Sequence, residues 1–301
     1  MDRKKVLSSP YILLPVLLIM WGSFAVGSKI VQKELDVHQL QFYIFLTAFI
    51  AYSLLLLVNG RKQKATKIRP SSLPLLILCG CFAFFYFFFY NRALGLLNAT
   101  EASIINYTFP VLIVLFDVMI NRVKFTVFKG LSLAVGLFGT IFIITNGNIT
   151  LFKLSNLEGD LYAFIGACSW ALFSVLGQKI GGDIMVNNFV YMVVGLVLSF
   201  SEMMIFSSPV LPSLTILLWV IWLGSFTFAI SNYIWFYAFQ VLSVSIVANV
   251  SFITPLVNLV FISLFLGEKV TLVQLLGLFI IIGAVLIQRL DKKIPNTKPN
   301  I

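Results

Sequence analysis

The chain has 301 residues, of which 60% are hydrophobic and 11% are charged. Soluble domains carry about 25% charged residues, so this composition excludes a soluble globular protein and predicts an integral membrane protein. The net charge of +10 does not indicate nucleic-acid binding, because the lysines and arginines lie in short segments between apolar runs rather than along one groove or helix face.

Ten apolar runs follow one another along the chain. They are continuous, rich in Leu, Ile and Phe, and lack a two-residue alternation, so they predict membrane-spanning helices rather than the strands of a barrel. The expected fold class is therefore an all-α integral membrane protein. The predicted helices lie near 11–30, 39–58, 72–91, 99–120, 127–145, 158–178, 187–206, 214–237, 243–266 and 270–289.

The basic residues predict the orientation of these helices. Short cytoplasmic loops carry an excess of lysine and arginine. With the N-terminus in the cytoplasm, ten spans place 16 of the 21 basic residues on the inner side, and both termini are cytoplasmic. The outer side keeps Lys29, Lys33, Arg92, Lys153 and Lys269.

The sequence also repeats itself. The segment from Trp21 to Lys29 (WGSFAVGSK) returns 149 residues later from Trp170 to Lys179 (WALFSVLGQK). Each copy contains five spans, an odd number, so the second copy is expected to be inverted in the membrane, as in many secondary transporters. The predicted organisation is a cytoplasmic N-terminus (1–10), a first repeat (11–145), a linker (146–157), a second repeat (158–289) and a cytoplasmic tail (290–301).

Several motifs together resemble a known family. Trp21-Gly22-Ser23 with Lys29 is followed by Ala93 and, 17 residues on, Pro110; Ala238 and Pro255 repeat that spacing, and Leu266-Gly267-Glu268-Lys269 precedes the last helix. This order resembles the EamA family of the drug/metabolite transporter superfamily. The resemblance implies export or exchange of small metabolites, such as amino acids, through a central cavity between the halves. The first half departs from the pattern, with Asn121-Arg122-Val123-Lys124 where the second has the acidic turn.

Polar and aromatic side chains recur at equivalent depths in the two copies. Tyr86 and Tyr90 share one helix face, and Ser231 and Trp235 align with them at an offset of 145 residues. Because polar groups facing lipid are costly, these positions are expected to point inward. They could line a cavity or join helices by hydrogen bonds, and the aromatic run at 82–90 could also face lipid. The predicted substrate-binding residues are Trp21, Tyr86, Tyr90, Asn106, Trp170, Ser231, Trp235, Asn249 and Ser251.

Few ionisable residues fall within the predicted spans. Asp117 is the candidate for proton coupling, with an interfacial role beside Arg122 and Lys124 as the alternative. Glu202, near an outer helix end, is a weaker candidate, and His38 is expected to be a solvated loop residue. Pro110 and Pro255 interrupt helices and are the candidate hinges for alternating access, with static kinks as the alternative.

These features favour a carrier that moves a small neutral or zwitterionic metabolite out of the cell. Transport is expected to proceed by alternating access around a cavity at mid-membrane. The alternative is a proton-coupled exporter of drugs or cationic amphiphiles. A membrane-embedded lipid-modifying enzyme fits less well, because the chain has one histidine and 11 acidic residues, mostly in predicted loops. A passive channel fits less well, because the polar groups cluster at one depth instead of forming a continuous stripe. No cofactor, metal or nucleic acid is expected. The expected partners are a small-molecule substrate, the bilayer of the cell membrane and a second copy of the chain in a homodimer, through glycine-rich helices such as 127–145.

Overall fold

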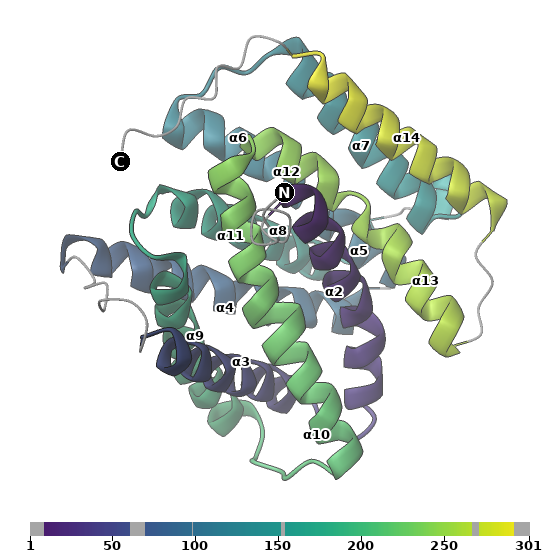
Figure 1. Ribbon diagram of the computed structural model, residues 1–301. Helices are drawn as coiled ribbons and strands as arrows, with labels where there is room; N and C mark the ends of the chain where they lie inside the picture. Colours follow the sequence, from purple (N-terminus) through teal and green to yellow (C-terminus); the bar gives the residue numbers. More distant parts are fainter. Residues whose placement is uncertain (1–8, 61–69, 98, 152–153, 267–270, 292–301) are drawn as a thin grey trace.

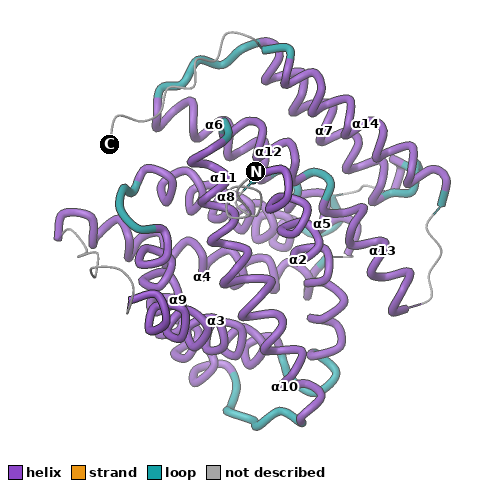
Figure 2. The backbone as a smooth tube through the Cα atoms, in the orientation of Figure 1, coloured by secondary structure: helices purple, strands orange, loops and turns teal. Residues whose placement is uncertain are grey.

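The computed structural model describes residues 9–60, 70–97, 99–151, 154–266 and 271–291, and its regular elements in these ranges are all helical (Figures 1 and 2). Residues 1–8 and 292–301, which make up most of the two predicted cytoplasmic ends, lie outside these ranges, as does most of the turn Leu266-Gly267-Glu268-Lys269.

Ten helical stretches in the described ranges are long and apolar enough to cross a membrane, as predicted. Their bounds differ from the predicted ones by at most five residues, so the periodicity and length of the apolar runs were sufficient to find them. The spans are α2 (Pro10–Val31), α3 (Val37–Gly60), α4 (Leu73–Leu96), α5 and α6 (Ala99–Asn106, Phe109–Asn121), α7 (Val127–Ile144), α8 (Leu157–Lys179), α9 (Ile184–Phe206), α10, η3 and α11 (Leu214–Ile221, Trp222–Ile230, Ser231–Val241), α12 and α13 (Val244–Ser251, Thr254–Leu266) and α14 (Leu272–Arg289).

The fourth and ninth spans are each broken into two helices. The sequence predicted a proline inside a continuous helix, but Pro110 and Pro255 occupy the second positions of α6 and α13. Proline is tolerated in the first turn, where its missing N–H has no helical acceptor. At the first break the Thr108 hydroxyl donates to the carbonyl of Ile105, at 2.7 Å. The two prolines therefore start helices rather than kink them, and a hinge role for them stays a prediction.

The eighth span contains a π-helix, η3, that the sequence did not predict. A π-helix is wider than an α-helix and often occurs at functional sites. Hydroxyl groups of α3 satisfy carbonyls along this span: Thr47 Oγ1 donates to Val220 at 3.2 Å, and Tyr52 donates to Ala229 at 2.9 Å. Gly224 permits the close approach, since a Cβ there would lie 1.8 Å from Thr47 Oγ1.

Two pairs of long helices that correspond in the repeat pack against each other in antiparallel fashion. Along α3 and α9, Phe42 lies beside Phe200 (5.7 Å between ring centroids) and Phe49 beside Phe189 (5.5 Å). Residue numbers thus rise along one helix as they fall along the other. In the α7–α14 pair, seen side by side in Figure 1, the Ser132 hydroxyl donates to Gln288 Oε1 at 2.8 Å, while the opposite ends meet through Asn146 and Thr271.

Glycines allow the α7–α14 contact. A Cβ on Gly139 would lie 3.2 Å from the carbonyl oxygen of Gly277, and a Cβ on Gly277 would lie 2.4 Å from Ile143 Cγ1. Small residues of this kind let the backbones of membrane helices approach closely. These glycines serve a contact within one chain, and a homodimer through these helices stays a prediction.

Candidate functional site

Three indole rings from three helices meet in the interior. Trp21 of α2 and Trp170 of α8 lie edge to face, with 5.6 Å between their ring centroids. Trp235 of α11 lies 5.0 Å from Trp21 and 6.3 Å from Trp170. Trp21 and Trp170 are the residues that the repeat places in equivalent positions, so the tryptophan cluster joins the two halves of the chain.

Serine hydroxyls hold two of the three indoles in place. Trp21 Nε1 donates to Ser231 Oγ at 3.1 Å, and Trp235 Nε1 donates to Ser174 Oγ at 3.0 Å. Each serine is fixed in turn by donating to the carbonyl four residues earlier in its own membrane span. The third indole is different: Trp170 Nε1 is buried and has no hydrogen-bond partner among the described residues. It is therefore a free donor next to two anchored neighbours.

A cavity of about 160 Å³ adjoins the tryptophan cluster. A dry cavity of roughly 150 Å³ accommodates a benzene ring, so the space in this conformation suits a small compound. Its walls come from α2, α4, α5, α6, α8, η3 and α13, and therefore from both halves. The lining residues are Trp21, Phe24, Ala25, Tyr86, Phe87, Tyr90, Ser103, Asn106, Tyr107, Phe109, Trp170, Thr227, Phe228, Thr254 and Asn258.

The lining combines aromatic rings with unpaired polar atoms and carries no ionisable acid or base other than phenols. Buried polar atoms normally have a partner, so unpaired ones around a cavity indicate where a ligand or water would bind. Besides the Trp170 indole N–H, three such atoms lie on cavity residues and lack a partner among the described residues. They are Asn106 Oδ1, Thr254 Oγ1 and Asn258 Oδ1.

The tyrosines of α4 form one wall of the cavity. Tyr86 lies 4.9 Å from Trp170 between ring centroids, and it stacks on Tyr90 with 5.9 Å between centroids and an interplanar angle of 8°. The Tyr86 hydroxyl also interacts with the side chain of Asn106. This face of the aromatic run therefore points into the protein rather than toward lipid.

The structure brings together seven of the nine predicted binding residues. Five line the cavity, and two, Ser231 and Trp235, stand behind Trp21 and are fully buried. The five lining residues are Trp21, Tyr86, Tyr90, Asn106 and Trp170.

The other two predicted residues lie outside the cavity lining. Asn249 Nδ2 donates to Ser132 Oγ at 3.2 Å, and Ser132 donates to Gln288, so this chain of bonds joins α12, α7 and α14. The Ser251 hydroxyl donates to the carbonyl of Ala248 at 2.6 Å. Asn249 thus has the interhelical bonding that was the alternative to cavity lining, whereas the Ser251 bond lies within α12.

Five polar cavity residues were not among the predicted ones, namely Ser103, Tyr107, Thr227, Thr254 and Asn258. The comparison of repeats favoured positions that are polar in both copies, and at the 145-residue offset Thr254 aligns with Phe109 and Asn258 with Ile113. A usable signal was present nonetheless. The four-residue spacing of Thr254 and Asn258 places both on one face of a largely apolar helix.

Asp117 is buried but is not part of the cavity lining. Its carboxylate accepts a hydrogen bond from Asn121 Nδ2 at 2.8 Å, and the ion pairs found among the described residues do not include it. Nearby, the Lys129 ammonium donates to the carbonyl of Lys124 at 2.7 Å. A coupling role for Asp117 stays a prediction.

An ionic cluster links α3, α4 and α9 away from the cavity. Glu202 Oε1 lies 2.7 Å from His38 Nδ1 and 3.5 Å from an Arg92 guanidinium nitrogen. The Arg92 guanidinium also sits 3.6 Å above the centre of the Phe88 ring. His38 belongs to the first turn of α3 and its side chain is 19% exposed, so the expectation of a solvated loop residue was wrong. Its partner lies 164 residues away, which local sequence cannot reveal.

Comparison with known proteins agrees with this architecture. The EamA-like transporter family matches residues 8–145 and again residues 157–289. The chain belongs to this family. A crystal structure with 20% sequence identity superposes with a TM-score of 0.80 and covers 95% of this chain and 99% of its own, which shows a shared fold.

Curated relatives carry the same general description. An uncharacterized transporter of Archaeoglobus fulgidus is 26% identical over 92% of this chain and 96% of its own length. The uncharacterized transporter YyaM of Bacillus subtilis is 26% identical over 84% of this chain and 85% of its own. The EamA-type chain is thus a multi-pass membrane protein of a transporter family, consistent with the expectation that it is not an enzyme.

Proposed function

We propose that this protein is a secondary carrier that moves a small neutral or zwitterionic metabolite, such as an amino acid or a related compound, across the cell membrane. The observation that carries the proposal is the uncharged aromatic cavity with unpaired hydrogen-bonding atoms, built where the two repeats meet. The substrate would bind there and become accessible to either side as the halves rock around it, with outward movement as the physiological direction.

The packing of equivalent helices supports an inverted arrangement of the repeats. Two-fold related, oppositely oriented copies require corresponding helices near the axis to be antiparallel, and α3 with α9 and α7 with α14 have that relation. In the repeat, α4 corresponds to the eighth span and α8 corresponds to α2. Accordingly, α4 packs on α8, and the eighth span packs on α2. Inverted repeats of this kind underlie alternating access in many carriers. The proposed orientation keeps both ends of the chain in the cytoplasm.

The chemistry of the lining supports the substrate class. Trp170 offers a donor, Asn106 and Asn258 offer carbonyl acceptors, and the Thr254 hydroxyl can act either way. A substrate with both donors and acceptors and an apolar part could satisfy these groups together. A net charge would have no counter-ion in the lining and would meet a large desolvation cost.

The aromatic walls also favour a second candidate, a proton-coupled exporter of cationic amphiphiles. The faces of tryptophan and tyrosine rings attract organic cations, and rings from Trp21, Tyr86 and Trp170 surround the cavity. Asp117 would then be the proton-binding group. This candidate requires transport to follow a proton gradient.

Exchange in proteoliposomes tests the proposal. Vesicles with purified protein would be loaded with amino acids, aromatic metabolites or amines and assayed for counterflow of the same labelled compound. We expect saturable, trans-stimulated exchange of a neutral or zwitterionic compound, equal in wild type and in Cys168→Ala, which lies outside the cavity lining. Exchange restricted to organic cations and driven by a pH gradient would favour the second candidate. Flux without saturation or trans-stimulation would contradict both.

A further inference from the structure

A second, larger pocket of about 340 Å³ opens on the side of the helical bundle. Its lining residues all belong to membrane-spanning stretches, namely α2, the eighth span and α13. We call it the lateral groove and define it by Ser23, Val26, Thr215, Leu218, Trp219, Trp222, Phe261 and Phe265. It is separate from the central cavity, with which it shares none of its residues.

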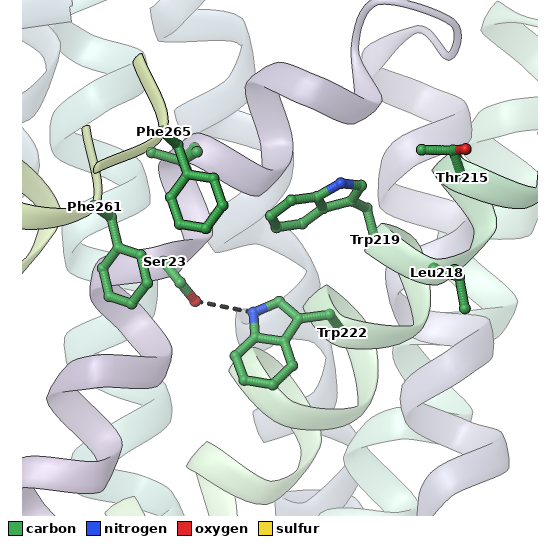
Figure 3. A pocket seen from close by; sticks show the side chains of 8 residues that line it. Ser23, Thr215, Leu218, Trp219, Trp222, Phe261 and Phe265 are labelled. Atoms are coloured by element: carbon green, nitrogen blue, oxygen red, sulfur yellow. Dashed lines mark hydrogen bonds between the residues drawn. The ribbon is translucent and has the colours of Figure 1, made fainter. Parts of the chain in front are cut away.

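The interior of the lateral groove is apolar. In Figure 3 the rings of Phe261 and Phe265 face those of Trp219 and Trp222 across the open space. The Ser23 hydroxyl is already engaged, since it donates to the carbonyl of Met20 at 2.7 Å and accepts from Trp222 Nε1 at 3.0 Å. A ligand inside the groove would therefore meet mainly hydrocarbon and ring surface, and the other polar groups of the lining are the Thr215 hydroxyl and the Trp219 indole N–H.

The groove opens onto the surface that faces hydrocarbon in a bilayer. Leu218 is 61% exposed and Phe265 is 55% exposed, and both form its edges. The segments that reach this pocket in the membrane are lipid acyl chains, because water and soluble metabolites are excluded from that depth. The volume suits a segment of one such chain.

A cation lies one turn beyond the groove on α2. Lys29 follows Val26 by three residues, which places it beside the groove in the last turn of the helix, and its side chain is exposed. The ion pairs among the described residues do not include Lys29. Long basic side chains at helix ends reach the headgroup layer. Lys29 is thus placed to meet the headgroup of a lipid whose chain enters the groove.

The two acidic residues that follow Lys33 in the chain, Glu34 and Asp36, are already bonded, and Asp36 accepts from the backbone N–H groups of His38 and Gln39. Glu34 accepts hydrogen bonds from the backbone N–H of Ser213 at 2.5 Å and from its hydroxyl at 2.7 Å. The backbone N–H and then the hydroxyl of Ser213 lower the pKa of the Glu34 carboxyl, which keeps it ionised and in place. Lys33, also exposed, adds a second positive charge one turn after Lys29.

We propose that the lateral groove binds one anionic phospholipid, with an acyl chain between the rings of Trp219 and Phe265 and the phosphate at Lys29. Basic side chains beside grooves between membrane helices are suited to anionic headgroups. This site would be occupied independently of the transported substrate, so the inference does not depend on the proposed function.

Quenching by brominated lipid tests the proposal, because bromine quenches an indole only on contact. Protein would be reconstituted in phosphatidylcholine vesicles containing a small fraction of lipid with brominated acyl chains, either phosphatidylglycerol or phosphatidylcholine. The difference between wild type and Trp219→Phe isolates the signal of Trp219. We expect brominated phosphatidylglycerol to quench that signal at lower mole fractions than brominated phosphatidylcholine.

Two lysine variants provide the decisive comparison. Lys29→Gln should lose most of the preference for phosphatidylglycerol, about five-fold if one lysine contributes on the order of 1 kcal/mol. Lys179→Gln changes the equivalent exposed lysine at the end of α8 and should retain the preference. Mass spectrometry of lipid that copurifies in detergent gives a second measurement, with less phosphatidylglycerol expected on Lys29→Gln. Equal quenching by both lipids, no quenching of Trp219, or a preference unchanged in Lys29→Gln would each overturn the proposal.

Discussion

The indole rings of Trp21 and Trp170 lie edge to face with 5.6 Å between their centroids, although 149 residues separate them in the chain. Their hydrogen bonding is unequal. Trp21 donates to Ser231, whereas the Trp170 N–H is left without a partner among the described residues. A pair that is equivalent in the repeat thus has one member fixed and one member available to a ligand.

Trp170→Phe is expected to weaken substrate binding without unfolding the protein. The substitution keeps an aromatic ring and removes the free N–H, so one hydrogen bond to substrate is lost. A net value of about 1 kcal/mol predicts a rise in KM of roughly five-fold in counterflow assays. Trp235→Phe is the matched control, because its N–H is bonded to Ser174 inside the protein. Trp235→Phe should lower the thermal unfolding midpoint and leave KM nearly unchanged. A larger rise in KM for Trp235→Phe than for Trp170→Phe would contradict the role of the Trp170 N–H in substrate binding.

Asn258→Asp is expected to change which substrates are carried. The variant places a carboxylate in a lining that otherwise lacks one, so a neutral or zwitterionic substrate loses an uncharged partner and organic cations gain a counter-ion. If the free energy of binding of the wild-type substrate is weakened by more than about 1.4 kcal/mol, its exchange should fall by more than ten-fold. Uptake of a quaternary amine should appear in the same variant. Asn258→Ala, which only removes the amide, should reduce exchange without creating cation uptake. Unchanged specificity in both variants would show that Asn258 does not contact substrate.

Asp117→Asn is expected to leave exchange largely intact. The residue lies outside the cavity lining, and its carboxylate is bonded to Asn121. Substrate counterflow with and without an imposed pH gradient would measure the effect at matched protein levels. Abolished transport with normal amounts of folded protein would instead assign proton coupling to Asp117 and favour the export of cations.

Gly277→Val is expected to destabilise the α7–α14 pair. A Cβ there would lie 2.4 Å from Ile143 Cγ1, and overpacking of this kind costs about 1–3 kcal/mol. The measurement is the thermal unfolding midpoint of the detergent-solubilised protein. Gly283→Ala is the matched control on the same helix, since a Cβ at Gly283 meets no atom within 4 Å. Equal midpoints for the two variants would contradict the packing argument.

The spans and the tryptophan cluster were predictable from sequence for physical reasons. Continuous apolar runs of membrane length have few alternatives to a helix, and the repeat placed Trp21 and Trp170 at equivalent depths. The π-helix η3 was not predictable, because hydrophobic periodicity does not distinguish a π turn from an α turn, and its contact with Tyr52 comes from a helix far away in the sequence.

The site itself was only partly predictable. Positions that are polar in both copies included Tyr86 and Asn106, which line the cavity, but also Ser251, the counterpart of Asn106, whose hydroxyl donates to a carbonyl of its own helix. Polarity at a given depth shows that a side chain turns inward, yet not whether it meets a cavity or another helix. Asn258 was missed because its equivalent in the first half is Ile113. Comparing the two repeats finds only residues that are polar in both, so a polar residue present in one repeat alone escapes it.

The π-helix gives the eighth span a tolerance that its counterpart α4 does not share. A π turn holds one residue more than an α turn, so deletion of one residue within η3 could convert that turn to α-helix without ending the span. Because the π turn absorbs the extra residue, α11 would keep its orientation relative to α10 after the deletion. Ser231 would still accept a hydrogen bond from Trp21 Nε1. Relatives that are one residue shorter at this segment would therefore be expected to keep both the membrane topology and the tryptophan cluster.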